Sequence, residues 1–152
     1  MNVNAAEIPL SQPLYGASFG QAVKRFFKKY ATFSGRASRS EYWWVQLFLW
    51  LVAALFSVLM SVAGVNMEAF TSGDAAALSA SLNGFGILLV TLSGIWGLVL
   101  IIPTMALTWR RLHDANLAGP WWFLSLTGVG GIVVFIMTLM PSNPAGVRFD
   151  RN

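Results

Sequence analysis

Residues 84–109 read GFGILLVTLSGIWGLVLIIPTMALTW and contain no ionisable side chain. At about 1.5 Å of rise per residue, a helix of this length exceeds the roughly 30 Å thickness of the hydrocarbon layer of a bilayer. A helix in a soluble bundle carries polar residues at helical spacing along one face, and this stretch lacks such a face. The stretch therefore predicts a membrane-spanning helix, with a kink expected at Pro103.

Two further runs have the same character. One covers residues 43–65 and the other covers residues 121–140, and neither contains Asp, Glu, Lys or Arg. The 152-residue chain is 56% hydrophobic and 11% charged, which leaves too little polar surface to enclose a soluble core. We therefore predict an all-α integral membrane protein with an N-terminal interfacial amphipathic helix followed by three transmembrane helices.

The predicted segments follow one another in a simple order. We expect a disordered N-terminal tail over residues 1–17, an interfacial helix over 18–32, a three-span membrane domain over 33–140 and a C-terminal tail over 141–152. The stretch from Met1 to Phe19 has no basic segment followed by an apolar one, so it does not read as a cleavable signal peptide. The first span is then expected to act as the targeting element.

The basic residues predict the orientation in the membrane. Six of the ten Lys and Arg residues precede the first span, and Arg110 and Arg111 lie between the second and the third. The connection over residues 66–83 carries Glu68 and Asp74 but no Lys or Arg. The positive-inside rule therefore places the N-terminus and the Arg110 connection in the cytoplasm, and the acidic connection and the C-terminus outside.

Residues 18–30 predict a short amphipathic helix ahead of the first span. Ser18 and Gln21 have the spacing of a capping box at its start. One face is aromatic and apolar, and the other is basic. The apolar face holds Phe19, Val23, Phe26, Phe27 and Tyr30, and the basic face holds Lys24, Arg25, Lys28 and Lys29. We expect this helix to lie in the interface with its cations near anionic lipid headgroups, although cations that only enforce orientation give the same pattern.

Two polar clusters flank the spans on the predicted cytoplasmic side. Their charged and titratable members are Arg36, Arg39, Glu41, Arg110, Arg111, His113 and Asp114. Ser38 and Glu41 have capping-box spacing, which favours a structural role for this carboxylate at a helix start. The arginines suit bidentate binding of phosphate or carboxylate, and they suit equally a salt-bridge network that docks the helices.

His113 next to Asp114 raises the possibility of acid–base chemistry, because imidazole titrates near neutrality and a carboxylate can orient it. Adjacency in sequence is weak evidence for that geometry, since a histidine at a helix end more often caps carbonyl groups. We therefore assign no catalytic residue. The chain has no Cys and one His, so no metal site is expected, and no cofactor motif is present. The basic pI is explained by topology, and no nucleic-acid-binding module accompanies it.

The run from Phe33 to Trp43, FSGRASRSEYW, and the run RRLHD over residues 110–114 occur together with Gly119 and Trp121. In this combination the chain resembles the DUF805 family of small bacterial inner-membrane proteins, and the tail PSNPAG over residues 141–146 resembles the family more loosely. The resemblance covers most of the chain from Ser18 onward and implies a bacterial cytoplasmic membrane, with no activity attached. The segment over residues 115–120, ANLAGP, is less polar than in many members.

Three hypotheses for function follow. The first is a non-enzymatic membrane protein that binds anionic lipid or a protein partner at the cytoplasmic face. The second is an oligomeric channel-like or transport-accessory protein, with Gly94 and Gly97 or the glycines at 128–131 at the seam between copies. The third is an interfacial lipid-modifying enzyme that uses His113 and Asp114. The predicted spans contain no ionisable residue, which argues against a pump made from one chain.

Overall fold

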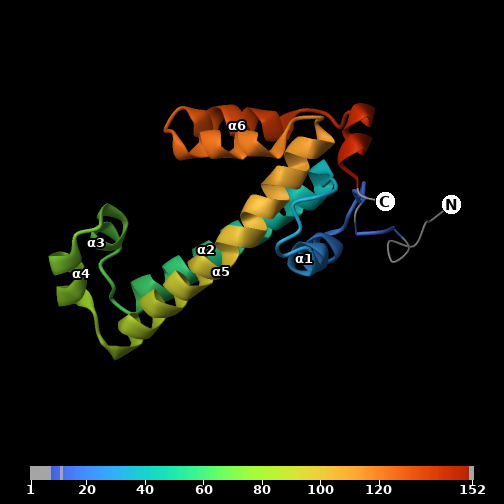
Figure 1. Cartoon of the computed structure of the whole chain (residues 1–152). Coiled ribbons are helices and arrows are strands. Elements are labelled where there is room, and N and C mark those ends of the chain that lie inside the picture. Colours follow the sequence, from blue (N-terminus) through green and yellow to red (C-terminus); the bar gives the residue numbers. More distant parts are fainter. Residues whose placement is uncertain (1–7, 11, 151–152) are drawn as a thin grey trace. The chain divides into compact units, whose positions relative to one another are not determined.

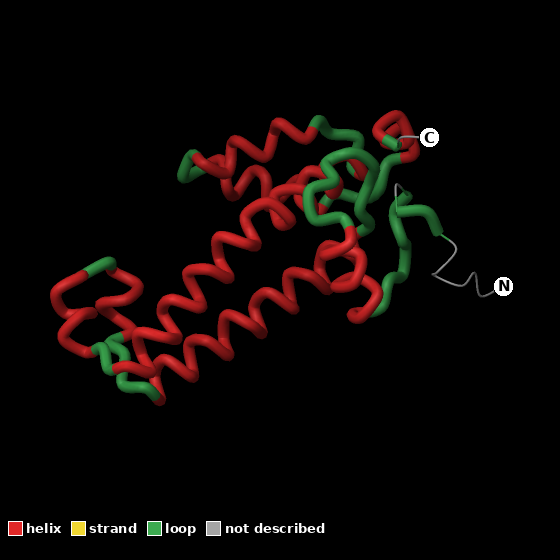
Figure 2. Tube along the Cα trace, turned by 60° about the horizontal axis from the view of Figure 1, so that its bottom comes forward, coloured by secondary structure: helices red, strands yellow, loops and turns green. Residues whose placement is uncertain are grey.

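The structure is a computed structural model that describes residues 8–10 and 12–150. Within these residues it consists of helices and connecting loops (Figures 1 and 2). In chain order the elements are α1 (Phe19–Lys28), α2 (Arg39–Val62), α3 (Met67–Ser72), α4 (Ala75–Ser81), α5 (Gly84–Asp114), η1 (Gly119–Leu126), α6 (Gly130–Leu139) and η2 (Pro144–Phe149). The all-helical prediction is therefore confirmed for the described part of the chain.

Two of the helices are long and apolar enough to cross a membrane. α2 has 24 residues and α5 has 31 residues. α2 begins four residues before the predicted run, and α5 begins at Gly84 as predicted but continues past Trp109 to Asp114. Pro103 lies within α5, and the helix continues through it.

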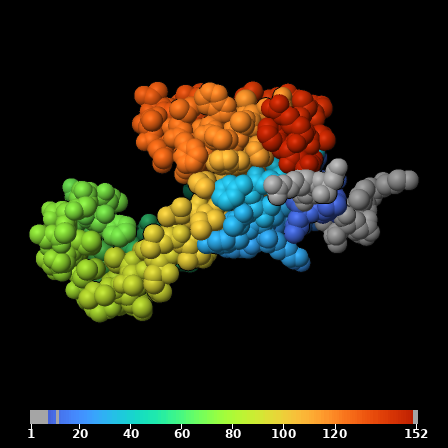
Figure 3. Space-filling model, viewed as in Figure 1, coloured from blue at the N-terminus to red at the C-terminus, as the bar shows by residue number. Residues whose placement is uncertain are grey.

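The predicted third span is not one helix. Residues 119–126 form the 3-10 helix η1, and α6 begins only after a turn at residues 127–129. The two elements pack against each other, and the space-filling view shows them in orange as one continuous block (Figure 3). The 10 residues of α6 rise about 15 Å, half the thickness of a hydrocarbon layer. The count of three spans is therefore not confirmed.

Glycine explains where the third run breaks. A Cβ atom on Gly130 would lie 2.0 Å from the carbonyl oxygen of Leu124, so only glycine allows α6 to return so close to η1. Gly94 and Gly97 differ, because a Cβ atom on either would have nothing within 4 Å. Packing within the chain does not use these two, and a role in self-association stays a prediction.

Capping boxes explain where the first two helices begin. Ser18 Oγ accepts from the backbone of Gln21 and the Gln21 side chain accepts from Ser18 N, as predicted. Ser38 and Glu41 repeat the arrangement at α2, with Glu41 N donating to Ser38 Oγ at 3.2 Å and Ser38 N donating to Glu41 Oε2 at 3.0 Å. Both boxes satisfy N–H groups that a helix start leaves unpaired.

The chain forms two compact units, and α2 and α5 each contribute residues to both. Residues 48–100 form one unit, whose small core holds Met60, Ala63, Val65 and Leu89. Within it, Asn66 caps α3, Asp74 caps α4, and Gly73 adopts the left-handed conformation with φ +78° between them. The acidic connection between the long helices is therefore itself helical.

The other unit, which we call the first unit, comprises the described residues up to 47 and from 101 onward. The disordered tail predicted up to residue 17 differs from the structure over residues 12–17, while residues 1–7 and 11 lie outside the described residues. Leu14 N donates to Glu41 Oε2 at 3.0 Å, and Ala17 N donates to Ser40 Oγ at 3.0 Å. Leu14 and Ala17 are buried, so this segment is part of the core.

The C-terminal segment packs against Gly35 and Arg36, which precede α2, and against the end of α5. Gly35 N donates to the carbonyl of Phe149 at 2.9 Å, Asn143 N donates to that of Asp114 at 2.8 Å, and Arg36 pairs with Asp150 at 2.7 Å. These contacts bring the C-terminal segment against the residues ahead of α2. The side of the membrane on which each end of the chain lies stays a prediction.

Candidate functional site

Glu41 joins three parts of the first unit. Besides the two backbone N–H groups of Ser38 and Leu14, its carboxylate accepts from Arg25 Nε at 2.5 Å. The Arg25 guanidinium also donates to the carbonyl of Gln12 at 2.6 Å. One carboxylate therefore holds α1, the start of α2 and the segment before α1 together, with its charge compensated by Arg25.

Asp114 is the second junction and is completely buried. Its carboxylate accepts from Arg111 Nη1 at 2.6 Å, from the Tyr15 hydroxyl at 2.9 Å and from Ser142 Oγ at 2.5 Å. Burial, and then the hydrogen bond to Asp114, raise the pKa of the Tyr15 hydroxyl. Asp114 thus connects the end of α5 to segments from both ends of the chain.

The two arginines beside Asp114 have internal partners. Arg111 donates through Nε to the carbonyl of Thr138 at 3.0 Å and through Nη2 to that of Met140, so it closes the end of α6. Arg36 binds Asp150 bidentately, with Nε and Nη2 at 3.0 and 2.7 Å, and its Nη1 lies 3.9 Å from Asp114. The hydrogen bonds to Asp150 raise the pKa of the Arg36 guanidinium.

His113 and Asp114 do not form the pair that their adjacency suggested. The His113 ring stacks on Phe149 with the centroids 4.0 Å apart and the planes 3° apart. Its Nδ1 lies 3.0 Å from the carbonyl oxygen of Gly35, which can only accept, so Nδ1 carries the proton. The imidazole and the Asp114 carboxylate therefore face different partners, and the contacts of His113 are those of a docking residue.

Gly146 lies under this stack. A Cβ atom there would be 2.4 Å from the carbonyl oxygen of His113 and 3.3 Å from Arg36 Cδ. The backbone of the C-terminal segment approaches the end of α5 so closely that no side chain fits. Gly119 has a comparable role, because its Cβ atom would lie 1.7 Å from the Trp109 indole nitrogen.

The predicted basic face of α1 divides in the structure. Lys24 and Lys28 are exposed, while Arg25 and Lys29 are 7% and 1% exposed and point into the protein. On the apolar face Phe26 is buried, whereas Phe19 and Phe27 are exposed and Val23 and Tyr30 are intermediate. The prediction that all four cations face lipid headgroups is therefore corrected for Arg25 and Lys29. These two lie on the face of the α1 segment, formed by residues 22, 25, 26 and 29, that packs against the protein.

Arg39 differs from the other arginines named above. Its side chain is exposed, and within the described residues it has neither a salt bridge nor a side-chain hydrogen bond. It borders a groove of about 350 Å³ that is lined also by Ser40, Trp43, Trp44 and Leu47. We call this the Arg39 groove.

Edge-to-face contacts hold the indole walls of the Arg39 groove. Trp44 meets Phe19 of α1 at 5.9 Å and 86°, and Trp43 meets Phe135 of α6 at 6.1 Å and 86°. Three helices therefore fix the walls, while the guanidinium at the rim stays free. The groove combines an unpaired cation with an apolar, aromatic interior.

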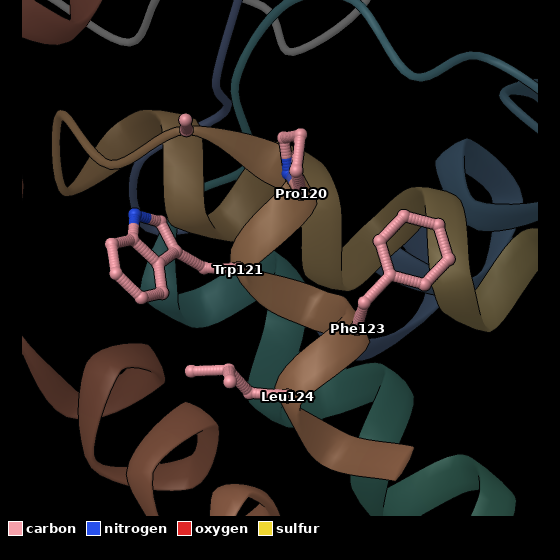
Figure 4. A pocket seen from close by; sticks show the side chains of 5 residues that line it. Pro120, Trp121, Phe123 and Leu124 are labelled. Atoms are coloured by element: carbon pink, nitrogen blue, oxygen red, sulfur yellow. The ribbon is translucent and has the colours of Figure 1, made fainter. Parts of the chain in front are cut away.

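A second groove of about 330 Å³ lies along η1, where residues three apart share a face. Figure 4 shows Trp121 and Leu124 on one side of this helix and Phe123 on the other. Its lining contains no charged side chain, so we place the candidate site at the Arg39 groove. No group of three or more His, Cys, Asp or Glu residues in the described part of the chain is arranged to hold a metal ion.

The sequence did not reveal four members of the ionic network. Tyr15, Arg25, Ser142 and Asp150 lie far along the chain from the residues that they bind. One signal was available for Asp150, because a chain with only six acidic residues leaves few partners for its buried arginines.

Comparison with known proteins identifies the family of this chain. The family model for DUF805, described as a protein of unknown function, matches residues 30–151. The chain belongs to the DUF805 family. It is 31% identical over 114 residues to inner membrane protein YhaI of Escherichia coli K12, which covers 73% of this chain and 78% of that protein.

A second relative gives a similar result. Inner membrane protein YhaH of Escherichia coli K12 is 28% identical over 126 residues, covering 82% of this chain and 89% of that protein. No solved structure matches. The matched region of the DUF805 chain includes both long helices and the Arg111–Asp114 pair, whereas Tyr15 precedes it. The chain is an integral membrane protein.

Proposed function

We propose that this DUF805 chain is a non-enzymatic protein of the bacterial inner membrane that binds anionic phospholipid at the cytoplasmic face through the Arg39 groove. The observation that carries the proposal is the free guanidinium at the rim of a groove walled by two tryptophans. A planar guanidinium binds a phosphate through two parallel hydrogen bonds, and indole rings favour the headgroup region of a membrane. Leu47, which also lines the groove, offers an apolar contact to an acyl chain.

Two other arginines of the predicted cluster, Arg36 and Arg111, support the structure instead of a ligand. Arg36 and Arg111 are satisfied by carboxylates and carbonyl groups of the chain itself. Exposed Lys24 and Lys28 add positive charge on the α1 surface, each contributing about 1 kcal/mol of attraction to an anionic membrane. Headgroup recognition then depends on Arg39, and general attraction depends on the lysines.

Replacing Arg39 by glutamine tests this division. In lipid nanodiscs of mixed phosphatidylglycerol and phosphatidylcholine, the R39Q protein should retain about fivefold less phosphatidylglycerol, as measured by native mass spectrometry after extraction. R39K, which keeps the charge and loses the planar fork, should fall between wild type and R39Q.

Lys28→Gln is the matched control, because it removes one exposed cation from the same unit without touching the groove. If K28Q and R39Q lose the same amount of phosphatidylglycerol, the groove has no special role and only the total charge matters. Binding of phosphatidylcholine should be equal in all variants.

We also propose that both chain ends face the cytoplasm, with α2 and α5 as the two spans. The exposed Arg39 closely follows Arg36, which binds Asp150, and the positive-inside rule assigns the side that carries the cations to the cytoplasm. Green fluorescent protein fused after Asn152 should therefore fluoresce, and alkaline phosphatase fused there should be inactive. A phosphatase inserted after Gly73 should be active. Active phosphatase at the C-terminus would instead require a third crossing.

A further inference from the structure

Among the described residues of the first unit, the buried charges do not balance. Glu41 is paired with Arg25, Asp114 with Arg111, and Asp150 with Arg36. Two further cations are buried in the same unit and belong to no ion pair in the described residues. These are Lys29 and Arg110, each 1% exposed.

Hydrogen bonding identifies the same two side chains independently. Lys29 Nζ and Arg110 Nη2 are buried and have no hydrogen-bond partner among the described residues. Arg110 Nε donates to the carbonyl of Ala106 at 3.1 Å, so only the outer part of this guanidinium is unsatisfied. A buried cationic donor without an acceptor is strongly unfavourable, and a nearby anion removes that penalty.

The Lys29 and Arg110 side chains lie close enough for their charges to repel each other. Lys29 is the C-cap residue of α1, and the backbone carbonyl of Arg110 accepts from Ala37 N at 3.0 Å, next to the start of α2. Burial lowers the pKa of Lys29 to about 7, and repulsion from Arg110 and Arg25 adds to this effect. Attraction from Glu41 acts on both side chains, but this carboxylate already accepts from Arg25 and two backbone N–H groups.

We propose that Lys29 and Arg110 together bind one phosphate-type oxyanion inside the first unit. An ammonium and a guanidinium group supply several N–H donors and up to two positive charges, which suits the several oxygens and the negative charge of a phosphate. The anion would satisfy both orphan donors and balance the excess charge at once. This site is separate from the Arg39 groove and does not depend on it.

The phosphate can belong to a phospholipid headgroup or to free inorganic phosphate, and two measurements distinguish these sources. The full-length protein is first released gently from its own membrane and weighed by native mass spectrometry. It is then delipidated in detergent and titrated with inorganic phosphate at constant ionic strength set by chloride, with the midpoint of thermal unfolding as the readout. Lys29→Met is compared with Lys28→Met, whose side chain is exposed.

We expect phosphate to raise the unfolding midpoint of wild type and K28M saturably, and the apparent Kd for phosphate to be at least tenfold weaker in K29M. A phospholipid retained by wild type and K28M but absent from K29M identifies the headgroup as the source, and a phosphate-sized adduct alone identifies the free anion. Phosphate that acts no better than chloride on wild type, or equally on K29M, overturns the proposal. Phosphorus-31 line broadening with wild type alone decides the case if K29M does not fold.

Discussion

Replacing Asp114 by asparagine is expected to lower the free energy of unfolding by about 3–5 kcal/mol. The carboxylate is completely buried and is the only carboxylate within salt-bridge distance of Arg111 in the described part of the chain. The substitution leaves that guanidinium, itself 0% exposed, as an uncompensated buried charge. It also weakens the bonds from Tyr15 and Ser142. Denaturant unfolding of wild type and D114N in the same detergent, followed by circular dichroism, measures the difference.

Asp74→Asn provides the control for this loss. Asp74 is exposed and caps α4, and asparagine caps a helix about as well as aspartate, so the change in stability should stay below about 0.5 kcal/mol. Equal losses in D114N and D74N would mean that the network at Asp114 contributes nothing beyond an average carboxylate.

Replacing Lys29 by methionine is expected to stabilise the protein by about 1–4 kcal/mol at pH 7 in phosphate-free buffer. Lys29 has a pKa of about 7 in the folded protein against an ordinary 10.5, so folding disfavours its charged form. Between these two pH values the unfolded chain holds a proton that the folded chain has released. Wild-type stability should therefore rise as the pH increases from about 7 towards 10.5, and this part of the rise should be absent in K29M.

The charged groups that act on Lys29 are Glu41, Arg110, Arg25 and Asp150. These four groups are present in both proteins, so the difference between K29M and wild type reports on Lys29. Lys28→Met, on the exposed surface of α1, should leave the pH dependence of stability as in wild type. Saturating phosphate should reduce the advantage of K29M. A wild type and K29M with parallel pH profiles would show that Lys29 titrates normally.

Local patterns predicted the long helices and their starting points well. The uncharged runs located α2 and α5, and the spacing of Ser18 with Gln21 and of Ser38 with Glu41 located two helix starts. These features depend on residues within a few positions of one another, so the sequence displays them directly.

The third apolar run shows the limit of such patterns. Its hydropathy and length fit a span, but Gly130 lets the chain turn back on η1. A window of mean hydropathy does not distinguish one long helix from two short ones that pack on each other. Gly130 carried the signal, and its steric role depends on the approach of the Leu124 carbonyl.

The candidate site divides in the same way. The sequence identified Arg36, Arg39, Glu41, Arg110, Arg111, His113 and Asp114 as a group, and the structure brings most of them into one unit with different partners. Whether they bind a ligand stays a prediction. That Arg39 is free while Arg111 is enclosed could not be read from residue type, because both are arginines beside apolar helices.

By itself the sequence determined that this chain is an α-helical membrane protein of the DUF805 family, since charge-free runs and local motifs suffice for that conclusion. Only the tertiary structure decided which cations are paired, which are exposed and which are buried without a partner. Tyr15, Asp114 and Asp150 are far apart in the chain. The contact of Tyr15 with Asp114, and those of Asp114 and Asp150 with Arg36, exist only once the segment before α1, the end of α5 and the C-terminal segment have packed. Charge balance inside a protein is a property of that packing, because burial sets the energetic cost of each unpaired group.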